Sequence, residues 1–261
     1  RKRYVGPENE TATGANFPRQ HVLEVDVANG VTLTTLDVTD ELPSTIQYTG
    51  STSAPSSSDQ SVPGPSSPGG ILTKRFSNLV GTAGSVDASV SVDWFVPEFD
   101  ALGTRVLDAS TGDDRVLRND GRASGIADPI DPRDSDLPFT LDADALAGDY
   151  PDDHEVTAKS IATQKSVVVV NDTGATGPTP GDLLEYTVAF QVSDYFTFGD
   201  VVVTDILGDG QTWDAAYQPV FAVNEGGSST GGTFGLTDYS LDTTERGPCG
   251  SGASRITFNL S

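Results

Sequence analysis

One short phrase occurs twice in this chain. Residues 38–43 read VTDELP and residues 203–208 read VTDILG, and each closes an apolar run of the kind that forms a strand. Two further pairs of segments match in the same order, namely 9–14 with 171–177 and 84–90 with 252–258. Since the three pairs keep a nearly constant offset, the sequence predicts an internal repeat of about 160 residues, which is typical of modular arrays rather than of a single-pocket enzyme.

The hydrophobic pattern predicts strands throughout. Apolar residues alternate with polar ones or are β-branched, and clusters of Gly, Pro, Asp, Asn and Ser separate them at short intervals. Alternation places Leu36, Val38 and Asp40 on one face of a strand, and it places His21 on the core face of another. We therefore predict an all-β fold of tandem immunoglobulin-like β-sandwich repeats.

The repeat suggests a division of the chain into two domains. We expect a first sandwich over residues 1–126 that contains a Ser/Pro/Gly-rich loop at 51–70, then an acidic connector over 127–158. A second sandwich is expected over 159–261, and its match to the first stops before the last strand. Either the natural protein continues past Ser261 or another subunit donates the missing strand, because a sandwich lacking a strand exposes an unpaired edge.

Composition excludes several classes of partner. A net charge of −23 argues against nucleic acid as a partner and against docking on anionic lipid. The single cysteine, Cys249, allows neither an intrachain disulfide nor a cysteine-based zinc site. No apolar run approaches the ~18 residues of a membrane span, so we expect no direct membrane insertion. An extracellular or cell-surface location fits these features.

The second repeat carries four motifs in a fixed order. They are KSVV at 165–168, PGD at 180–182, EYTV at 185–188 and VVVTDIL at 201–207. This order resembles the isopeptide-forming fimbrial domains and a widespread related domain of unknown function, which are repeats of large prokaryotic surface proteins. The first repeat keeps the VTD element and a closing NDGRA at 119–123, but it reads PRQH at 18–21, where the family has PGD and a tyrosine.

The resemblance implies a covalent crosslink. In isopeptide-forming members a lysine of the first strand bonds to an asparagine of the last strand, and a buried carboxylic acid promotes the reaction. It casts Lys2 and Asn119 as the bonded pair of the first repeat and Asp40 as the acid. In the second repeat Lys165 and Asp205 match, and the asparagine would lie beyond the end of the sequence.

An ordinary interpretation of the same residues stays open. A lysine one position from the chain start, between two arginines, is usually solvated. Asp40 and Asp205 could simply cap the turns that follow their strands. Many members of the broader repeat family have the Thr-Asp motif without any crosslink.

Calcium is the candidate cofactor, since oxygen ligands on a loop between two β-domains suit this ion. The candidate ligands crowd the connector: Asp128, Asp131, Asp134 and Asp136. The alternative is a solvated acidic linker that binds no metal.

Two further residue classes bear on function. Asn9 and Asn171 begin sequons for N-glycosylation. The two histidines, His21 and His154, accompany no nucleophile elbow, phosphate loop or metal-binding histidine pair. We therefore expect no enzymatic activity.

The leading hypothesis is an extracellular structural protein, part of a surface filament, fimbria or stalk-like adhesin, in which sandwich modules stack end to end. Its partners would be copies of itself or further repeats of the same protein. The rival is an adhesin module that binds a host-surface or glycan ligand through loops such as 51–70, with a calcium-rigidified linker. An accessory domain of a carbohydrate-active enzyme is a third option.

Overall fold

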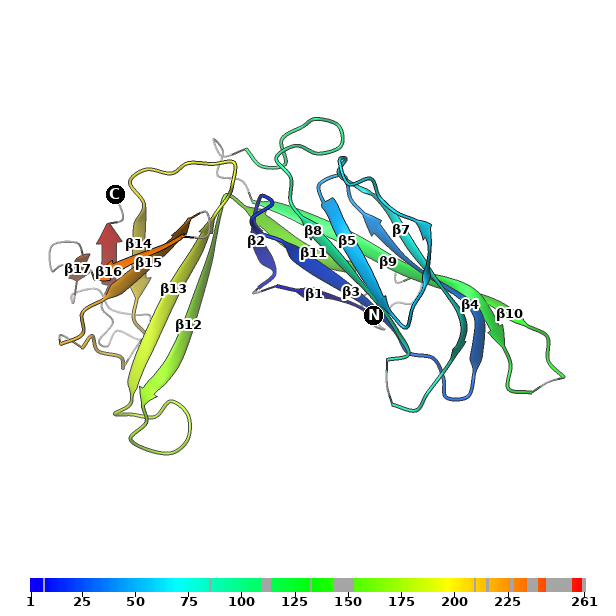
Figure 1. Cartoon of the computed structure of the whole chain (residues 1–261). Helices are drawn as coiled ribbons and strands as arrows, with labels where there is room; N and C mark the ends of the chain where they lie inside the picture. The colour runs from blue at the N-terminus through cyan, green and yellow to red at the C-terminus, as the bar shows by residue number, and fades with distance from the viewer. Residues whose placement is uncertain are drawn as a thin grey trace. The chain divides into compact units, whose positions relative to one another are not determined.

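The computed structural model describes residues 1–6, 8–84, 86–108, 114–131, 133–142, 153–208, 210–214, 216–225, 228–233, 239–242 and 255–259. Every regular element among them is a strand, which confirms the predicted all-β class (Figure 1). The chain separates into two compact units, Arg1–Phe196 and Thr197–Ser261.

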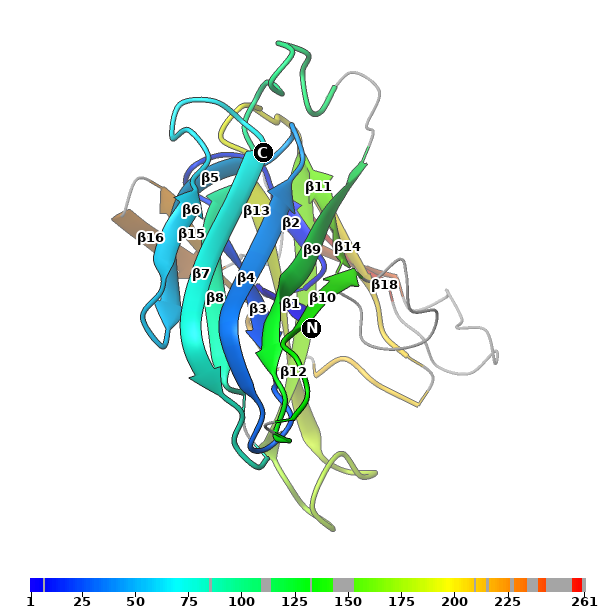
Figure 2. The ribbon, with the colours of Figure 1, turned by 90° about the vertical axis from the view of Figure 1, so that its right-hand side faces the viewer.

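Two sheets build most of the first unit. The smaller has the order β1 (Lys2–Val5), β3 (Arg19–Val25), β8 (Ala88–Phe95) and β5 (Gln47–Ala54). The larger has the order β2 (Glu10–Ala12), β11 (Asp153–Lys159), β9 (Arg115–Asp128), β4 (Thr32–Leu42), β7 (Gly70–Val80) and β6 (Ser58–Ser61). Figure 2 shows the larger sheet lying in front of the smaller one, as two stacked layers. All pairs are antiparallel except β2 with β11.

Side chains from both sheets meet in one core. Along β8 burial alternates strictly, and Val90, Val92 and Trp94 are almost inaccessible. From the larger sheet Leu36 and Phe76 pack against them. This is the two-layer arrangement of a β-sandwich, in which every second residue of a strand faces the opposite sheet.

The Ser/Pro/Gly-rich segment 51–70 differs from the loop that its composition predicts. Strand β5 runs on to Ala54, and Ser58–Ser61 forms β6 at the edge of the larger sheet. Small polar residues can pair here because an edge strand needs backbone partners on one side only and no buried side chains. The segment therefore leaves fewer loop residues for ligand contacts than expected.

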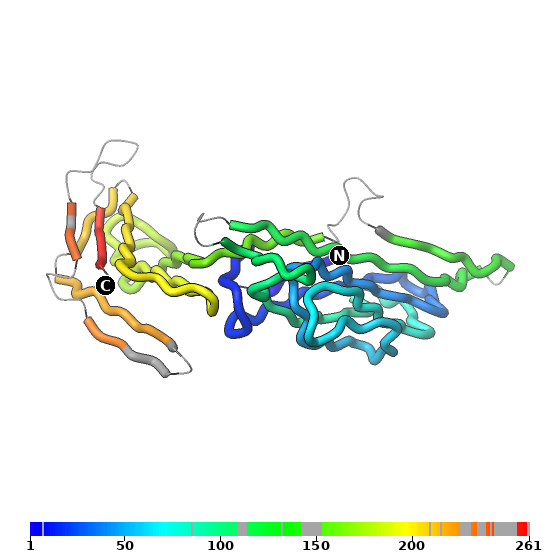
Figure 3. Tube along the Cα trace, turned by 90° about the horizontal axis from the view of Figure 1, so that it is seen from above, coloured from blue at the N-terminus to red at the C-terminus, as the bar shows by residue number. Residues whose placement is uncertain are grey.

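The acidic segment 127–158 also contributes to the sandwich. Strand β9 extends to Asp128 and turns back as β10 (Leu137–Asp142), a hairpin that reaches past the neighbouring strands (Figure 3). Strand β11 then pairs with β9 on one side and β2 on the other. Backbone pairing does not require apolar side chains on an exposed face, so the acidic composition concealed these strands.

A second hairpin follows in the same unit, formed by β12 (Ile161–Asn171) and β13 (Leu183–Val192). Asp182 stabilises the loop between these two strands. The Asp182 carboxylate accepts hydrogen bonds from the backbone amides and hydroxyls of Thr173 and Thr179, and these amides hold the pKa of Asp182 down at about 2. Gly181 supplies a positive φ of 102° before it. The PGD motif therefore stabilises the loop that joins β12 to β13.

Contacts at the end of β13 attach the hairpin to the first sandwich. The Thr13 and Ser193 hydroxyls lie 2.5 Å apart in a buried position, and the Asp194 amide donates to the Thr13 carbonyl. The Asp194 carboxylate accepts from the backbone and side-chain amides of Asn16, each at 3.0 Å. Gly14 has a φ of 124° and approaches Asp194 so closely that a Cβ there would lie 2.1 Å from its carboxylate.

The second unit contains two small sheets. One has the order β14 (Val202–Ile206), β18 (Arg255–Asn259) and β17 (Tyr239–Asp242), and the other pairs β15 (Val220–Glu225) with β16 (Ser228–Thr233). Because β18 pairs directly with β14, it has the neighbour relation that β7 has to β4. The sequence match of 252–258 to 84–90 is therefore wrong as an equivalence of strands, since β8 lies in the sheet opposite β4.

Gly14→Ala tests the attachment of the hairpin. The added methyl group would displace the Asp194 side chain and would also strain the backbone at positive φ. We expect hydrogen exchange at the Asp194 amide to accelerate by roughly tenfold or more. Gly103→Ala is the matched control, because Gly103 has a φ of 78° with nothing within 4 Å of its Cβ position. Equal, small effects of both substitutions would contradict the close approach.

Candidate functional site

Lys2 points into the sandwich while its neighbours point out. Arg1 and Arg3 both bind Glu24 on the outer side of β3, at 2.5 Å and 3.2 Å. Since side chains alternate along a strand, this outer clamp turns the lysine between the two arginines inward. The whole residue is only 3% exposed, so the expectation of a solvated terminal lysine is wrong.

The Lys2 ammonium meets the carboxylate of Asp40 in the core. Nζ lies 2.5 Å from Oδ1, and the side chains are 0% and 1% exposed. Asp40 comes from the face of β4 that also carries Leu36 and Val38, as the alternation of the sequence predicts. It lies two residues before the end of β4 and is paired on both sides, so it does not cap the following turn.

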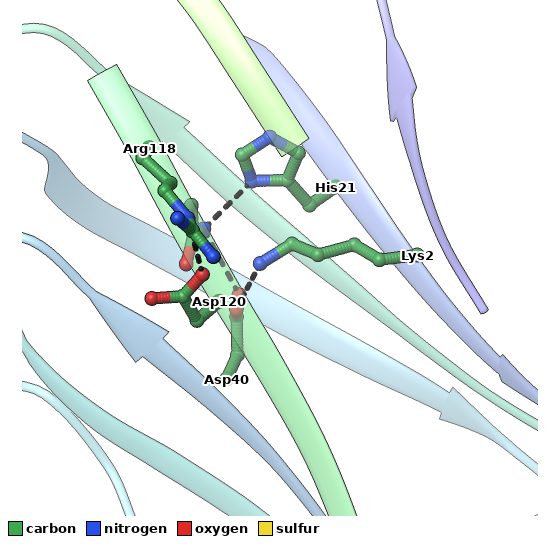
Figure 4. A network of polar contacts seen from close by, with 6 residues as sticks. Lys2, His21, Asp40, Arg118 and Asp120 are labelled. Atoms are coloured by element: carbon green, nitrogen blue, oxygen red, sulfur yellow. Dashed lines mark hydrogen bonds and ion pairs between the residues drawn. The ribbon is translucent and has the colours of Figure 1, made fainter. Parts of the chain in front are cut away.

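Asn119 completes the cluster from the neighbouring strand β9. The pairing of Asp40 with Gly121 puts Asn119 on the same face of the sheet, and the residue is fully buried. Its Nδ2 lies 3.5 Å from Oδ2 of Asp40 and 2.9 Å from Nδ1 of His21. Its Oδ1 has no hydrogen-bond partner within the described part of the chain. Figure 4 shows Lys2 and Asp40 pointing toward each other, with His21 beside them.

The residues on either side of Asn119 face the other way. Arg118 binds Asp120 at 3.1 Å on the exposed side of the sheet (Figure 4), and it also binds Asp153 of β11 at 3.1 Å. These ion pairs hold the residues next to Asn119 on the outer face of β9, just as Glu24 holds the residues next to Lys2 on the outer face of β1. Each is exposed and contributes only a fraction of a kcal/mol, but together they oppose rotation of the strand.

Burial changes the acid–base properties of Asp40. Desolvation raises the pKa of its carboxyl above the ordinary value, and the ammonium of Lys2 together with hydrogen bonds from Lys2 and Asn119 opposes this rise. A carboxylate buried next to an ammonium can take the proton and leave two neutral groups, since neither charge is well solvated. Burial therefore lowers the free-energy cost of passing a proton from Lys2 to Asp40.

Four aromatic rings cover the cluster, and both histidines of the chain are among them. His21 stacks on Trp94 at 4.9 Å, and His154 from β11 stacks on Tyr4 at 5.3 Å. Desolvation, followed by the charge of Lys2, lowers the pKa of His21 to about 2, so its ring is neutral. Sequence analysis placed His21 on a core face but assigned it no partner, because contact between facing sheets leaves no local pattern.

The predicted residues of the second repeat, Lys165 and Asp205, belong to different compact units. Lys165 is an exposed residue of β12 with its Nζ 4.5 Å from the centre of the Tyr186 ring. Asp205 is a half-buried residue of β14 and belongs to the other compact unit. Their pairing stays a prediction.

The remaining candidate residues are on the surface. Asp131 binds the guanidinium of Arg133, and the described residues contain no group of three or more His, Cys, Asp or Glu side chains that could hold a metal ion. Of the sequon asparagines, Asn9 and Asn171 are both exposed, but Thr11 of the first sequon is fully buried.

Comparison with known proteins does not assign the chain to a family. No model of a known protein family matches the chain, and no curated protein matches it. Within the described ranges no helix is long and apolar enough to cross a membrane.

His21 should make the fold sensitive to acid. The unfolded chain binds a proton near pH 6.5 that the folded chain accepts only near pH 2, so stability is lost as pH falls below 6.5. We expect the free energy of unfolding in urea to fall between pH 7 and pH 4.5 by about 2–3 kcal/mol more than in His21→Phe, which lacks this group. The carboxylates that the two proteins share contribute equally to both pH profiles, so the difference between the profiles reports His21. Parallel pH profiles would contradict the lowered pKa of His21.

Proposed function

We propose that the chain is a structural module of an extracellular surface filament, fimbria or stalk, and that Lys2 and Asn119 become joined by an isopeptide bond promoted by Asp40. One observation carries the proposal. The amine, the acid and the amide that the resemblance selects from distant parts of the sequence are all buried, with Nζ of Lys2 2.5 Å from Asp40 and Nδ2 of Asn119 3.5 Å from the same carboxylate.

The arrangement supports a balanced amide exchange. Lys2 gives a proton to Asp40, and the neutral Nζ attacks Cγ of Asn119 while the protonated acid polarises the amide. The Nζ–Cγ bond forms and the Cγ–Nδ2 bond breaks, with Asp40 delivering a proton to the departing nitrogen. Of the three ammonium protons of Lys2, one ends on that nitrogen, which leaves as ammonia, one stays on the new amide nitrogen, and one remains on Asp40, which ends as a neutral acid.

Burial supplies the driving conditions for this exchange. Reacting groups held on neighbouring strands behave as one molecule, and well-oriented intramolecular reactions gain effective concentrations of about 10⁵ M or more. The unpartnered Oδ1 of Asn119 adds to this, because a buried acceptor without a donor costs about 1–3 kcal/mol.

The crosslink would join the two sheets near the start of the chain. Lys2 is on β1 of the smaller sheet and Asn119 is on β9 of the larger, so the bond would close a loop that contains most of the sandwich. A covalent closure of this length restricts the unfolded chain much as a disulfide does, by about 4–5 kcal/mol. The only cysteine, Cys249, cannot provide such a closure within the chain.

Two other features suit a load-bearing module. The net charge of −23 makes neighbouring molecules repel one another, which opposes side-by-side aggregation. The contacts of Asp194 with Asn16 and Thr13 fix the following hairpin to the sandwich. A stiff attachment transmits tension instead of dissipating it in a linker.

Intact mass provides the direct test of the crosslink. We expect the purified protein to weigh about 17 Da less than its sequence mass, through loss of ammonia, because the reaction should go to completion in a folded core. Lys2→Met and Asp40→Ala should have the full sequence mass. Lys165→Met is the matched control and should show the same deficit as the parent protein. An undiminished mass of the parent would overturn the proposal.

Force spectroscopy tests the mechanical role. Pulling the crosslinked protein from its ends should leave the segment between Lys2 and Asn119 folded into a closed loop. The contour length released should therefore be shorter than that of Asn119→Ala by roughly 40 nm, at about 3.5 Å per extended residue. Equal extensions of the two proteins would show that no covalent link carries the force.

A further inference from the structure

His21 contacts the atom that must leave in the proposed reaction. Its Nδ1 lies 2.9 Å from Nδ2 of Asn119, between β3 of the smaller sheet and β9 of the larger. On the other side of the same nitrogen is Oδ2 of Asp40, at 3.5 Å. The amide nitrogen of Asn119 is thus placed between a nitrogen lone pair and a carboxyl oxygen.

The ring of His21 is held in place and kept neutral by its surroundings. It is 1% exposed, stacks on Trp94 and lies beside Tyr4, at 5.9 Å between ring centres. Burial and the nearby Lys2 lower the pKa of His21 far below neutrality. A neutral ring that accepts a hydrogen bond at Nδ1 carries its proton on Nε2.

Burying the Nε2 proton of His21 costs free energy. Nε2 of His21 has no hydrogen-bond partner among the residues described, so the sandwich buries an unsatisfied donor. A phenylalanine would stack on Trp94 as well and would leave no donor unsatisfied. The feature that a phenylalanine lacks is the Nδ1 acceptor, and its partner is the Asn119 amide.

We infer that His21 is a positioning residue of the crosslinking reaction, and that it selects the orientation of the Asn119 amide. This inference rests on the proposed function. By accepting from Nδ2, His21 directs this nitrogen toward the oxygen of Asp40 that delivers the proton. Without the acceptor the amide can turn about its terminal bond, and the departing nitrogen loses its alignment with the acid. His21 forms and breaks no covalent bond in this scheme.

The kinetics of crosslinking test the inference. The full chain is prepared as inclusion bodies, dissolved in denaturant without having folded, and diluted into refolding buffer, and the mass loss of about 17 Da is followed with time. We expect His21→Phe to crosslink about tenfold to a hundredfold more slowly than the parent, because the ring remains but the acceptor is lost. His21→Gln offers an amide oxygen as acceptor and should recover part of the rate.

Two controls separate positioning from folding. His154→Phe changes the other histidine, which stacks on Tyr4, and it should crosslink at the parent rate. Asn119→Ala and Asn119→Ala/His21→Phe cannot react, so the difference between their urea midpoints measures the structural effect of the ring change alone. A rate loss in His21→Phe with matched midpoints in this pair supports the inference.

The outcomes distinguish the two proposals. If the parent loses ammonia and His21→Phe does so at the same rate, the role of His21 is overturned and the crosslink stands. If His21→Gln is as slow as His21→Phe while His154→Phe is unaffected, a simple acceptor role is also overturned. If the parent keeps its full mass, the crosslinking function itself fails.

Discussion

The buried contact between the Lys2 ammonium and the Asp40 carboxylate is the interaction on which the first sandwich depends. Removing two charges from water costs several kcal/mol per ion, and their attraction recovers this cost only with good geometry. The surrounding strands supply that geometry from outside the core. Glu24 holds the two arginines that flank the lysine, and the register of β4 with β9 presents the carboxylate and Asn119 on one face. Buried charges and unpaired polar atoms raise the free energy of the unreacted core, and this favours a reaction that removes them.

Amide formation would remove the features of this core that are hardest to stabilise. The ammonium of Lys2 becomes part of a neutral amide, and Asp40 ends as a neutral acid that needs no opposite charge. Folding would therefore store free energy in the arrangement, and the reaction would release it. On this view the hydrophobic core of the sandwich has two roles, since the apolar side chains that stabilise the fold also exclude the water that would solvate Lys2 and Asp40.

The sequence predicts this site unevenly, for physical reasons. Strand alternation alone puts Asp40 in the core, because its row includes Leu36 and Val38. It gives no such information for Lys2, whose strand is four residues long, and there the family resemblance was needed. His21 was placed on a core face, but its contact with Asn119 crosses between sheets and depends on how the two layers stack. Backbone pairing explains the other differences, since segments 51–70 and 127–158 form strands without a hydrophobic period to mark them.

The pairing of β12 with β13 repeats features of the pairing of β1 with β3. Lys165 pairs with Val188 as Lys2 pairs with Leu23, and the spacing from Val188 to Asp205 equals that from Leu23 to Asp40. In this register Tyr186 takes the position of His21, and the Lys165 ammonium lies over its ring. A tyrosine has no ring nitrogen that could orient an amide, although its hydroxyl can accept a hydrogen bond. If the two strand pairs share an ancestor, the lysine and the acid have kept a constant spacing while the residue in the position of His21 differs.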